Sequence, residues 1–91
     1  MRIIGSIDHP VLKISVFRND NRISIKFENT QYEQIFKMKE SITNVEEAQR
    51  FADEAFCKNV EKQFVAMHQN KMEALQRFLP QNNEEEFEKI I

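Results

Sequence analysis

The sequence predicts an α+β domain in which an antiparallel sheet is followed by a long helical segment. Apolar and polar residues alternate through most of residues 11–38, which is the pattern of strands that are buried on one face. Residues 45–79 contain no glycine or proline and are rich in residues that favour helix. A chain of 91 residues is the size of one domain, so we expect a single domain over residues 1–91, with strands in residues 1–40 and helix in residues 44–91.

The sheet is predicted to be a meander of three or four strands. Three runs have the strand pattern: residues 11–18, 22–28 and 32–40. Asn19-Asp20-Asn21 predicts a three-residue hairpin loop, because Asn and Asp tolerate left-handed backbone angles. Residues 1–4 are expected to add a fourth strand that ends at Gly5.

The helical half has a start signal and a stop signal. Thr43 and Glu46 have the spacing of a capping box, in which each side chain bonds the backbone of the other residue. Pro80 is expected to end the long helix, because its ring clashes with the preceding turn. Residues 84–91 are then predicted to form a short final helix.

The long helix is too long for the domain. About 35 residues would span on the order of 50 Å, whereas a compact domain of this size is about 30 Å across. The apolar residues also form two sets, on faces turned by about a third of a rotation. The first set is Val45, Ala48, Phe51, Ala52, Ala55 and Phe56, and the second is Val60, Phe64, Met67, Leu75 and Phe78. Either the helix breaks near residues 68–70, or its distal half packs against a second chain, and we favour the second chain.

Composition indicates a folded protein of the cytoplasm. Apolar residues make up 41% and charged residues 31% of the chain, which is typical of a soluble folded domain. The single cysteine, Cys57, excludes an intramolecular disulfide. The chain lacks an apolar run of about 18 residues and a secretion signal, so we expect a cytoplasmic location and no membrane partner.

The stretch GSIDHP, residues 5–10, collects residues that are rare elsewhere in the chain. A histidine beside an acid, as in Asp8-His9, can act as a general base or a metal ligand. A metal site needs three or four ligands, and the other His and Cys, His68 and Cys57, are distant in sequence. We interpret the stretch as a structured turn or a bulged strand crossing, and as a site only if Cys57 or His68 lies beside it.

Other catalytic patterns are weak. Cys57 and His68 are about 16 Å apart if they lie on one helix, too far for a nucleophile and its base. A phosphate-binding loop needs several glycines, and the chain has one. We therefore expect a protein that is not an enzyme and that has no metal and no cofactor.

The favoured hypothesis is a non-catalytic protein-interaction module that forms a homodimer through its C-terminal helical region. The apolar residues after position 59 are more than one small sheet can cover, and each large side chain left in water costs roughly 1.5–3 kcal/mol. The expected interface residues are Val60, Phe64, Met67, Met72, Leu75, Phe78, Leu79, Phe87, Ile90 and Ile91.

The alternative hypothesis is single-stranded nucleic-acid binding by the outer face of the sheet. Residues 1–39 hold seven basic and four acidic residues, whereas residues 40–91 hold six basic and eleven acidic residues. If Leu12, Ile14, Val16, Ile23, Ile25, Phe27, Phe36 and Met38 face the helix, the opposite face carries Lys13, Phe17, Arg22, Lys26, Lys37 and Lys39. Cations that follow phosphates and a ring that stacks on a base are how such proteins bind single strands.

Overall fold

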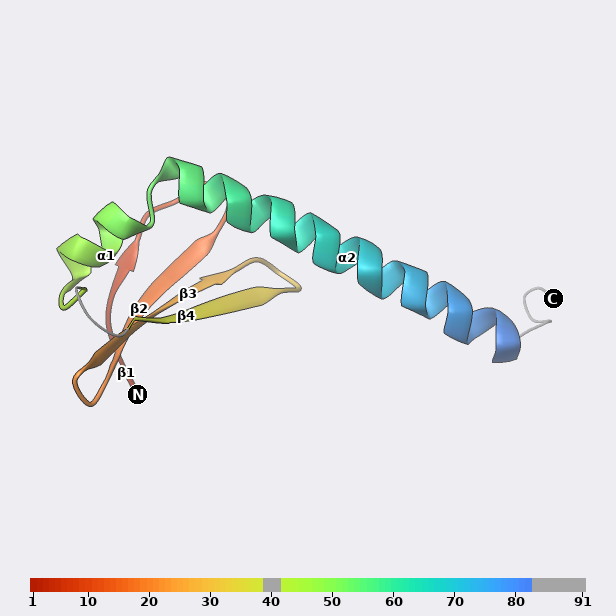
Figure 1. Cartoon of the computed structure of the whole chain (residues 1–91), viewed down its shortest axis with the longest axis horizontal. Helices are drawn as coiled ribbons and strands as arrows, with labels where there is room; N and C mark the ends of the chain where they lie inside the picture. The colour runs from red at the N-terminus through yellow and green to blue at the C-terminus, as the bar shows by residue number, and fades with distance from the viewer. Residues whose placement is uncertain (39–41, 83–91) are drawn as a thin grey trace.

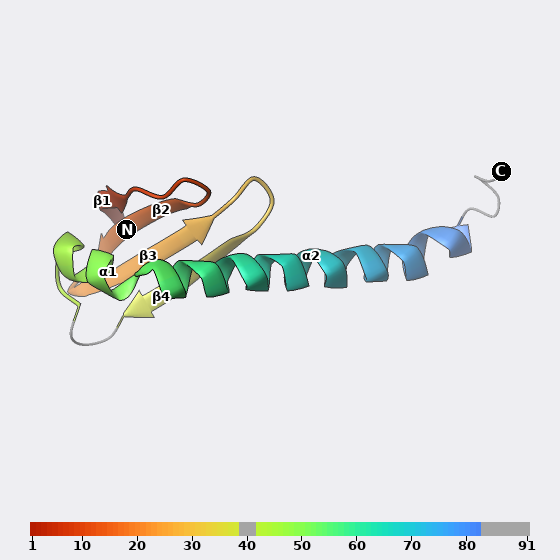
Figure 2. The ribbon, with the colours of Figure 1, turned by 90° about the horizontal axis from the view of Figure 1, so that it is seen from above.

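The computed structural model describes residues 1–38 and 42–82, with side chains described through residue 79. The described elements are β1 (Arg2–Ile7), β2 (Lys13–Asn19), β3 (Arg22–Glu28), β4 (Glu33–Met38), α1 (Val45–Phe51) and α2 (Glu54–Asn82). The strands form one antiparallel sheet in the order β1-β2-β3-β4. Figures 1 and 2 show α1 and the start of α2 over one face of this sheet, while the rest of α2 extends beyond it. The predicted α+β class is confirmed.

The core lies between the sheet and the helices. Val16 pairs with Ile25, and Ile25 pairs with Phe36, so the alternating apolar residues of three strands share one face. The side chains predicted to face the helix are buried (Leu12, Ile14, Val16, Ile23, Ile25 and Phe27) or half-buried (Phe36 and Met38). The helices complete the core with buried Ala48, Ala52, Cys57, Val60 and Phe64.

The hairpin between β2 and β3 is tighter than predicted. Asn19 pairs with Arg22, so the loop contains only Asp20 and Asn21. Asp20 has a φ of 59°, in the left-handed region that Asn and Asp tolerate. The expected three-residue loop was wrong by one residue, because Asn19 joins the ladder.

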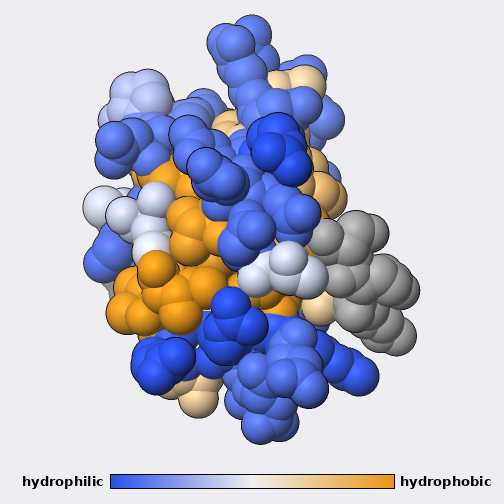
Figure 3. Space-filling view, turned by 90° about the vertical axis from the view of Figure 1, so that its left-hand side faces the viewer, coloured by the Kyte–Doolittle hydropathy of each residue, from blue (hydrophilic) through white to orange (hydrophobic). Residues whose placement is uncertain are grey.

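Strand β1 does not end at Gly5. It continues to Ile7, with a bulge where Ile3 pairs with Phe17 and Gly5 pairs with Val16. A Cβ atom on Gly5 would lie 2.9 Å from Cγ2 and 3.1 Å from Cγ1 of Val45. The glycine therefore serves the close approach of α1 to the sheet, and not a strand end. Figure 3 views this end of the molecule, where hydrophobic surface lies between hydrophilic side chains.

The start of α1 is capped one residue later than predicted. The side-chain oxygen of Asn44 accepts a hydrogen bond from the Glu47 backbone N–H at 2.8 Å. Glu47 Oε1 in turn accepts from the backbone N–H of Thr43 at 2.8 Å and from its hydroxyl at 3.0 Å. The backbone bond from Thr43, followed by the hydroxyl bond, lowers the pKa of Glu47. Asn44 and Glu47, not Thr43 and Glu46, are the capping pair.

The helical segment breaks at residues 52–53, and not near residues 68–70. Ala52 has φ −87° and ψ 61°, and its N–H donates to the Ala48 carbonyl at 2.9 Å, which ends α1. Asp53 Oδ1 accepts from the Phe56 N–H at 2.9 Å, which caps α2 as a new helix. The two apolar sets thus lie mainly on two helices with different directions. The alternative of a break near residues 68–70 is therefore wrong, because α2 is continuous there, and the break that does occur lies at residues 52–53.

Helix α2 is continuous through residues 68–70 and runs to Asn82, so Pro80 does not end it. Only two residues of α2 follow Pro80, so the proline affects the last turn of the helix and not its interior. The predicted helix at residues 84–91 and the end of the predicted third strand, residues 39–40, lie outside the described residues.

Candidate functional site

The distal part of α2 is a projecting, solvent-exposed arm. Its 29 residues span about 43 Å, whereas the second longest dimension of the molecule is 26 Å. Every residue from 68 to 79 is exposed. We call residues 68–79 the arm, and residues 2–38 with 42–67 the body. Figures 1 and 2 show the arm leaving the body beyond the turn between β3 and β4.

A line of exposed side chains, apolar except for His68, runs from the last turn of the body along the arm. Val65, His68, Met72, Leu75 and Leu79 recur at intervals of three and four residues, which is the spacing of a coiled-coil contact line. We call these five residues the seam. All five are exposed. Cys57, Val60, Phe64 and Met67 form a second line with the same spacing, and this line faces the sheet.

The predicted interface divides into three groups. Val60 and Phe64 are only 1% and 3% exposed because they pack against the sheet, so assigning them to an interface was wrong. Met67 is half-buried, and its sulfur accepts from Gln34 Nε2 at 3.9 Å. The exposed members are Met72, Leu75, Phe78 and Leu79. Phe87, Ile90 and Ile91 lie outside the described residues.

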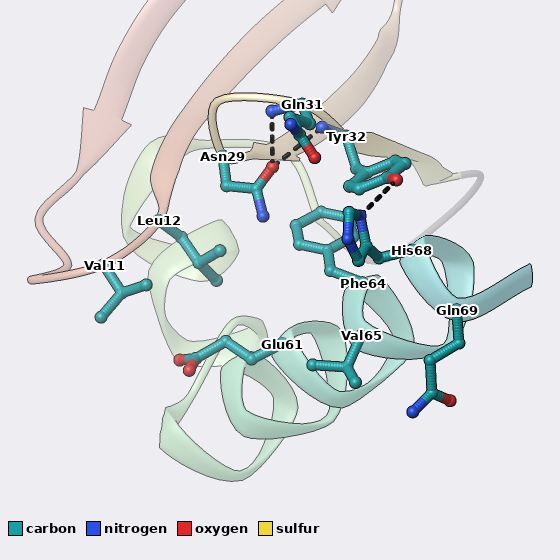
Figure 4. A pocket seen from close by; sticks show the side chains of 10 residues that line it. All are labelled: Val11, Leu12, Asn29, Gln31, Tyr32, Glu61, Phe64, Val65, His68 and Gln69. Atoms are coloured by element: carbon teal, nitrogen blue, oxygen red, sulfur yellow. Dashed lines mark hydrogen bonds between the residues drawn. The ribbon is translucent and has the colours of Figure 1, made fainter. Parts of the chain in front are cut away.

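A groove of about 560 Å³ adjoins the seam where α2 passes the loops of the sheet (Figure 4). Its apolar lining is Val11, Leu12, Phe64 and Val65, and its polar lining is Asn29, Gln31, Tyr32, Glu61, His68 and Gln69. Because Val65 and His68 belong to both surfaces, the groove and the seam form one continuous surface. We had not predicted Val65 as an interface residue, although its seven-residue spacing to Met72 indicates it.

The polar groups of the groove are held in place by hydrogen bonds. Asn29 Oδ1 accepts from the backbone N–H groups of Gln31 at 2.9 Å and Tyr32 at 2.8 Å, which fixes the turn before β4. The Tyr32 hydroxyl and His68 Nδ1 are 2.9 Å apart and hydrogen-bonded. Lys71 Nζ lies 5.3 Å from the centre of the Tyr32 ring, so this lysine is directed toward its own sheet. Figure 4 shows Asn29, Gln31, Tyr32 and His68 along one side of the groove.

The stretch GSIDHP combines the bulged end of β1, which runs to Ile7, with the turn that begins at Asp8. His9 Nδ1 accepts from the backbone N–H groups of Val11 at 3.1 Å and Leu12 at 3.0 Å. His9 Nε2 lies 3.8 Å from Glu61 Oε2. Both ring nitrogens of His9 therefore serve the turn and its packing against α2.

Cys57 does lie beside this turn, and it lines a cavity of about 340 Å³ together with Asp8 and His9. Its thiol is buried and lies 3.8 Å from the Ala52 carbonyl oxygen, to which it donates. Burial raises the pKa of Cys57, with further contributions from the charges of Glu61 and Asp53, so the reactive thiolate is disfavoured. Among the described residues, no three His, Cys, Asp or Glu side chains gather as a metal site would require.

The outer face of the sheet carries most of the predicted nucleic-acid residues. The register places Lys13, Phe17, Arg22, Lys26 and Lys37 on this face, and Lys39 lies outside the described residues. Lys26 Nζ is 3.2 Å from Glu28 Oε1 and 5.5 Å from the centre of the Phe17 ring. The central cation is thus paired with an acid and lies over the only aromatic ring among these residues.

The fold and the exposed surfaces define a small α+β domain with one projecting helical arm. No protein-family model matches the chain, and no curated protein or solved structure matches it significantly. Neither helix, within the residues that the structure describes, has the length and apolar content needed to cross a membrane.

Proposed function

We propose that this chain is a non-catalytic interaction module that self-associates as a homodimer through the arm. The observation that carries the proposal is the exposed seam, whose apolar members Met72, Leu75 and Leu79 lie beyond the sheet that covers the rest of α2. A cytoplasmic location is part of the same proposal.

The energetic argument is that the arm gains from a partner. Covering a large apolar side chain is worth roughly 1.5–3 kcal/mol. An isolated helix shorter than about 12–15 residues is marginal in water, so tertiary or quaternary packing normally supports such a segment. A two-fold symmetric pair is the commonest arrangement because one surface serves both partners.

Sedimentation over a wide concentration range tests the proposal. The full chain is expected to shift from monomer to dimer as concentration rises. Leu75→Glu is expected to weaken the dimer at least about tenfold, because it places an unpaired charge in an apolar contact. Asn70→Glu is the matched control, since it adds the same charge to the arm away from the seam and leaves the dimer intact.

A chain that remains strictly monomeric at the highest soluble concentration contradicts the proposal. Equal weakening by Leu75→Glu and Asn70→Glu also contradicts it, because the effect would then follow net charge and not the seam. Circular dichroism of both variants checks that α2 is retained.

Single-stranded nucleic-acid binding is the second candidate function. The observation in its favour is that the sheet places Lys13, Arg22 and Lys37 on one face with Phe17. Titration of a fluorescent single-stranded oligonucleotide at low salt tests it, with Lys26→Glu combined with Lys37→Glu as the variant. Absence of binding, or binding that this double variant leaves unchanged, removes this candidate.

A further inference from the structure

We infer that α2 of a second copy packs antiparallel along the seam and places its Leu79 in the groove. This inference rests on the proposed homodimer and specifies its geometry. The groove is open in one chain, and Leu79 of the second copy would supply an apolar side chain that covers its lining of Val11, Phe64 and Val65.

The first argument is the continuity of the two surfaces. The groove opens beside Glu61, Val65 and His68, which lie on consecutive turns of α2. The seam starts at Val65 and runs to Leu79 along the same side of the helix. A helix that follows the seam toward the body therefore reaches the groove (Figure 4).

The second argument is the register of an antiparallel pair. The residues of a contact line alternate between two heptad positions, a and d. In an antiparallel pair, a residue at position a of one helix lies beside a residue at position d of the other. Leu75 of one copy then lies beside Val65 of the other, and Met72 lies beside His68. The same register places Leu79 beside Glu61, which lines the groove. Each seam residue thus meets either a seam residue or the groove.

A parallel pair does not fill the groove. It would place Val65 beside Val65 and leave Leu79 at the far end of the arm, away from both bodies. Only the antiparallel direction brings the apolar end of one arm to the body of the other.

The third argument is the area available. Five apolar side chains of the seam and the groove expose between 36% and 63% of their surface: Val11, Val65, Met72, Leu75 and Leu79. If a large side chain has roughly 150–200 Å² of surface, these expose on the order of 500 Å² per chain. A standard stable interface buries about 800 Å² per partner, including its polar rim. Asn29, Gln31 and Gln69 are positioned to supply that rim.

Cysteine cross-linking distinguishes the two directions. Val65→Cys and Leu75→Cys chains, each with Cys57→Ala, are purified separately, mixed and oxidised. The antiparallel pair predicts a disulfide between the two different variants and little linkage within either alone. Linkage of Val65→Cys to itself, with no mixed product, indicates a parallel pair and overturns the inference while leaving the homodimer intact.

A second variant tests the groove without changing α2. Val11→Glu is expected to weaken self-association about tenfold, because the charge faces the apolar end of the second helix. Thr30→Glu adds the same charge to an exposed loop position that does not line the groove, and it should have no effect. Equal behaviour of the two variants overturns the groove assignment. A strictly monomeric chain overturns both this inference and the homodimer.

Discussion

The two halves of α2 carry similar apolar patterns and have opposite environments. In the proximal half, Val60 and Phe64 are buried under the sheet. In the arm, Leu75 and Phe78 continue on nearly the same side of the helix and are exposed. The difference arises from the length of the strands, because the sheet ends before the helix does. A periodic apolar pattern therefore predicts that a face is covered, but it does not indicate whether the same chain covers it.

The largest contrast between body and arm is expected from removing one apolar side chain in each. Phe64→Ala should lower the free energy of unfolding by about 3–5 kcal/mol, because it leaves a cavity in the core. Leu79→Ala should change it by less than about 0.5 kcal/mol at concentrations where the chain is monomeric. Urea unfolding followed by circular dichroism measures both. Similar losses in the two variants would show that the arm folds back on the body.

The contact between β1 and α1 gives the next largest effect. Gly5→Ala should cost about 1–3 kcal/mol, because the new methyl group lies within 2.9 Å of Val45 Cγ2. Val45→Ala removes that carbon atom. Gly5→Ala should therefore lower the free energy of unfolding less in the Val45→Ala variant than in the unchanged chain. Thermal unfolding of the four chains measures the coupling. Independent, additive effects would contradict close packing at Gly5.

Thiol reactivity compares body and arm directly. Cys57 should react with a thiol reagent far more slowly in the native chain than in urea, because it is buried and its pKa is raised. A cysteine placed on the arm by Leu75→Cys should react in dilute solution as an exposed thiol does. Stopped-flow absorbance with an aromatic disulfide measures both rates. Rapid native modification of Cys57 would contradict its burial.

The smallest expected effect concerns the cap of α1. The pKa of Glu47 is lowered in the folded chain, so its contribution to stability is present above the ordinary carboxyl pKa and is lost as pH falls through the folded value. Glu47→Gln should therefore lower the melting temperature slightly at pH 7. The difference should shrink as the pH falls below the usual carboxyl range. A difference that stays constant with pH would exclude the charge of Glu47 as its cause.

The sheet could be predicted from sequence because alternation is a local signal. Ile14, Ile25 and Phe27 are buried as their period of two requires. The position of the helix break could not be predicted as easily. Asp53 lies among good helix formers, and its capping role becomes visible only once Ala52 is buried against the sheet.

The candidate site was predicted in part. Met72, Leu75 and Leu79 were identified from the excess of apolar residues in the second half of the chain. Val65 was not predicted, because the apolar face through Val60, Phe64 and Met67 is the core line of the helix and Val65 lies on a second line beside it. The groove forms because Val11 and Val65 of α2, more than fifty positions apart in the chain, line the same hollow. A local sequence pattern does not predict that two such distant residues lie close together.

The continuity of α2 links the orientation of its buried face, under the sheet, to the orientation of the exposed seam on the arm. Because the helix is unbroken from Glu54 to Asn82, the packing of Phe64 under the sheet sets the direction in which Leu79 points. One residue inserted between them would turn the seam by about 100° and advance it by about 1.5 Å, whereas seven would nearly restore its direction. The direction in which the seam faces is therefore set by how the buried part of α2 packs in the core, and not by the exposed residues of the arm.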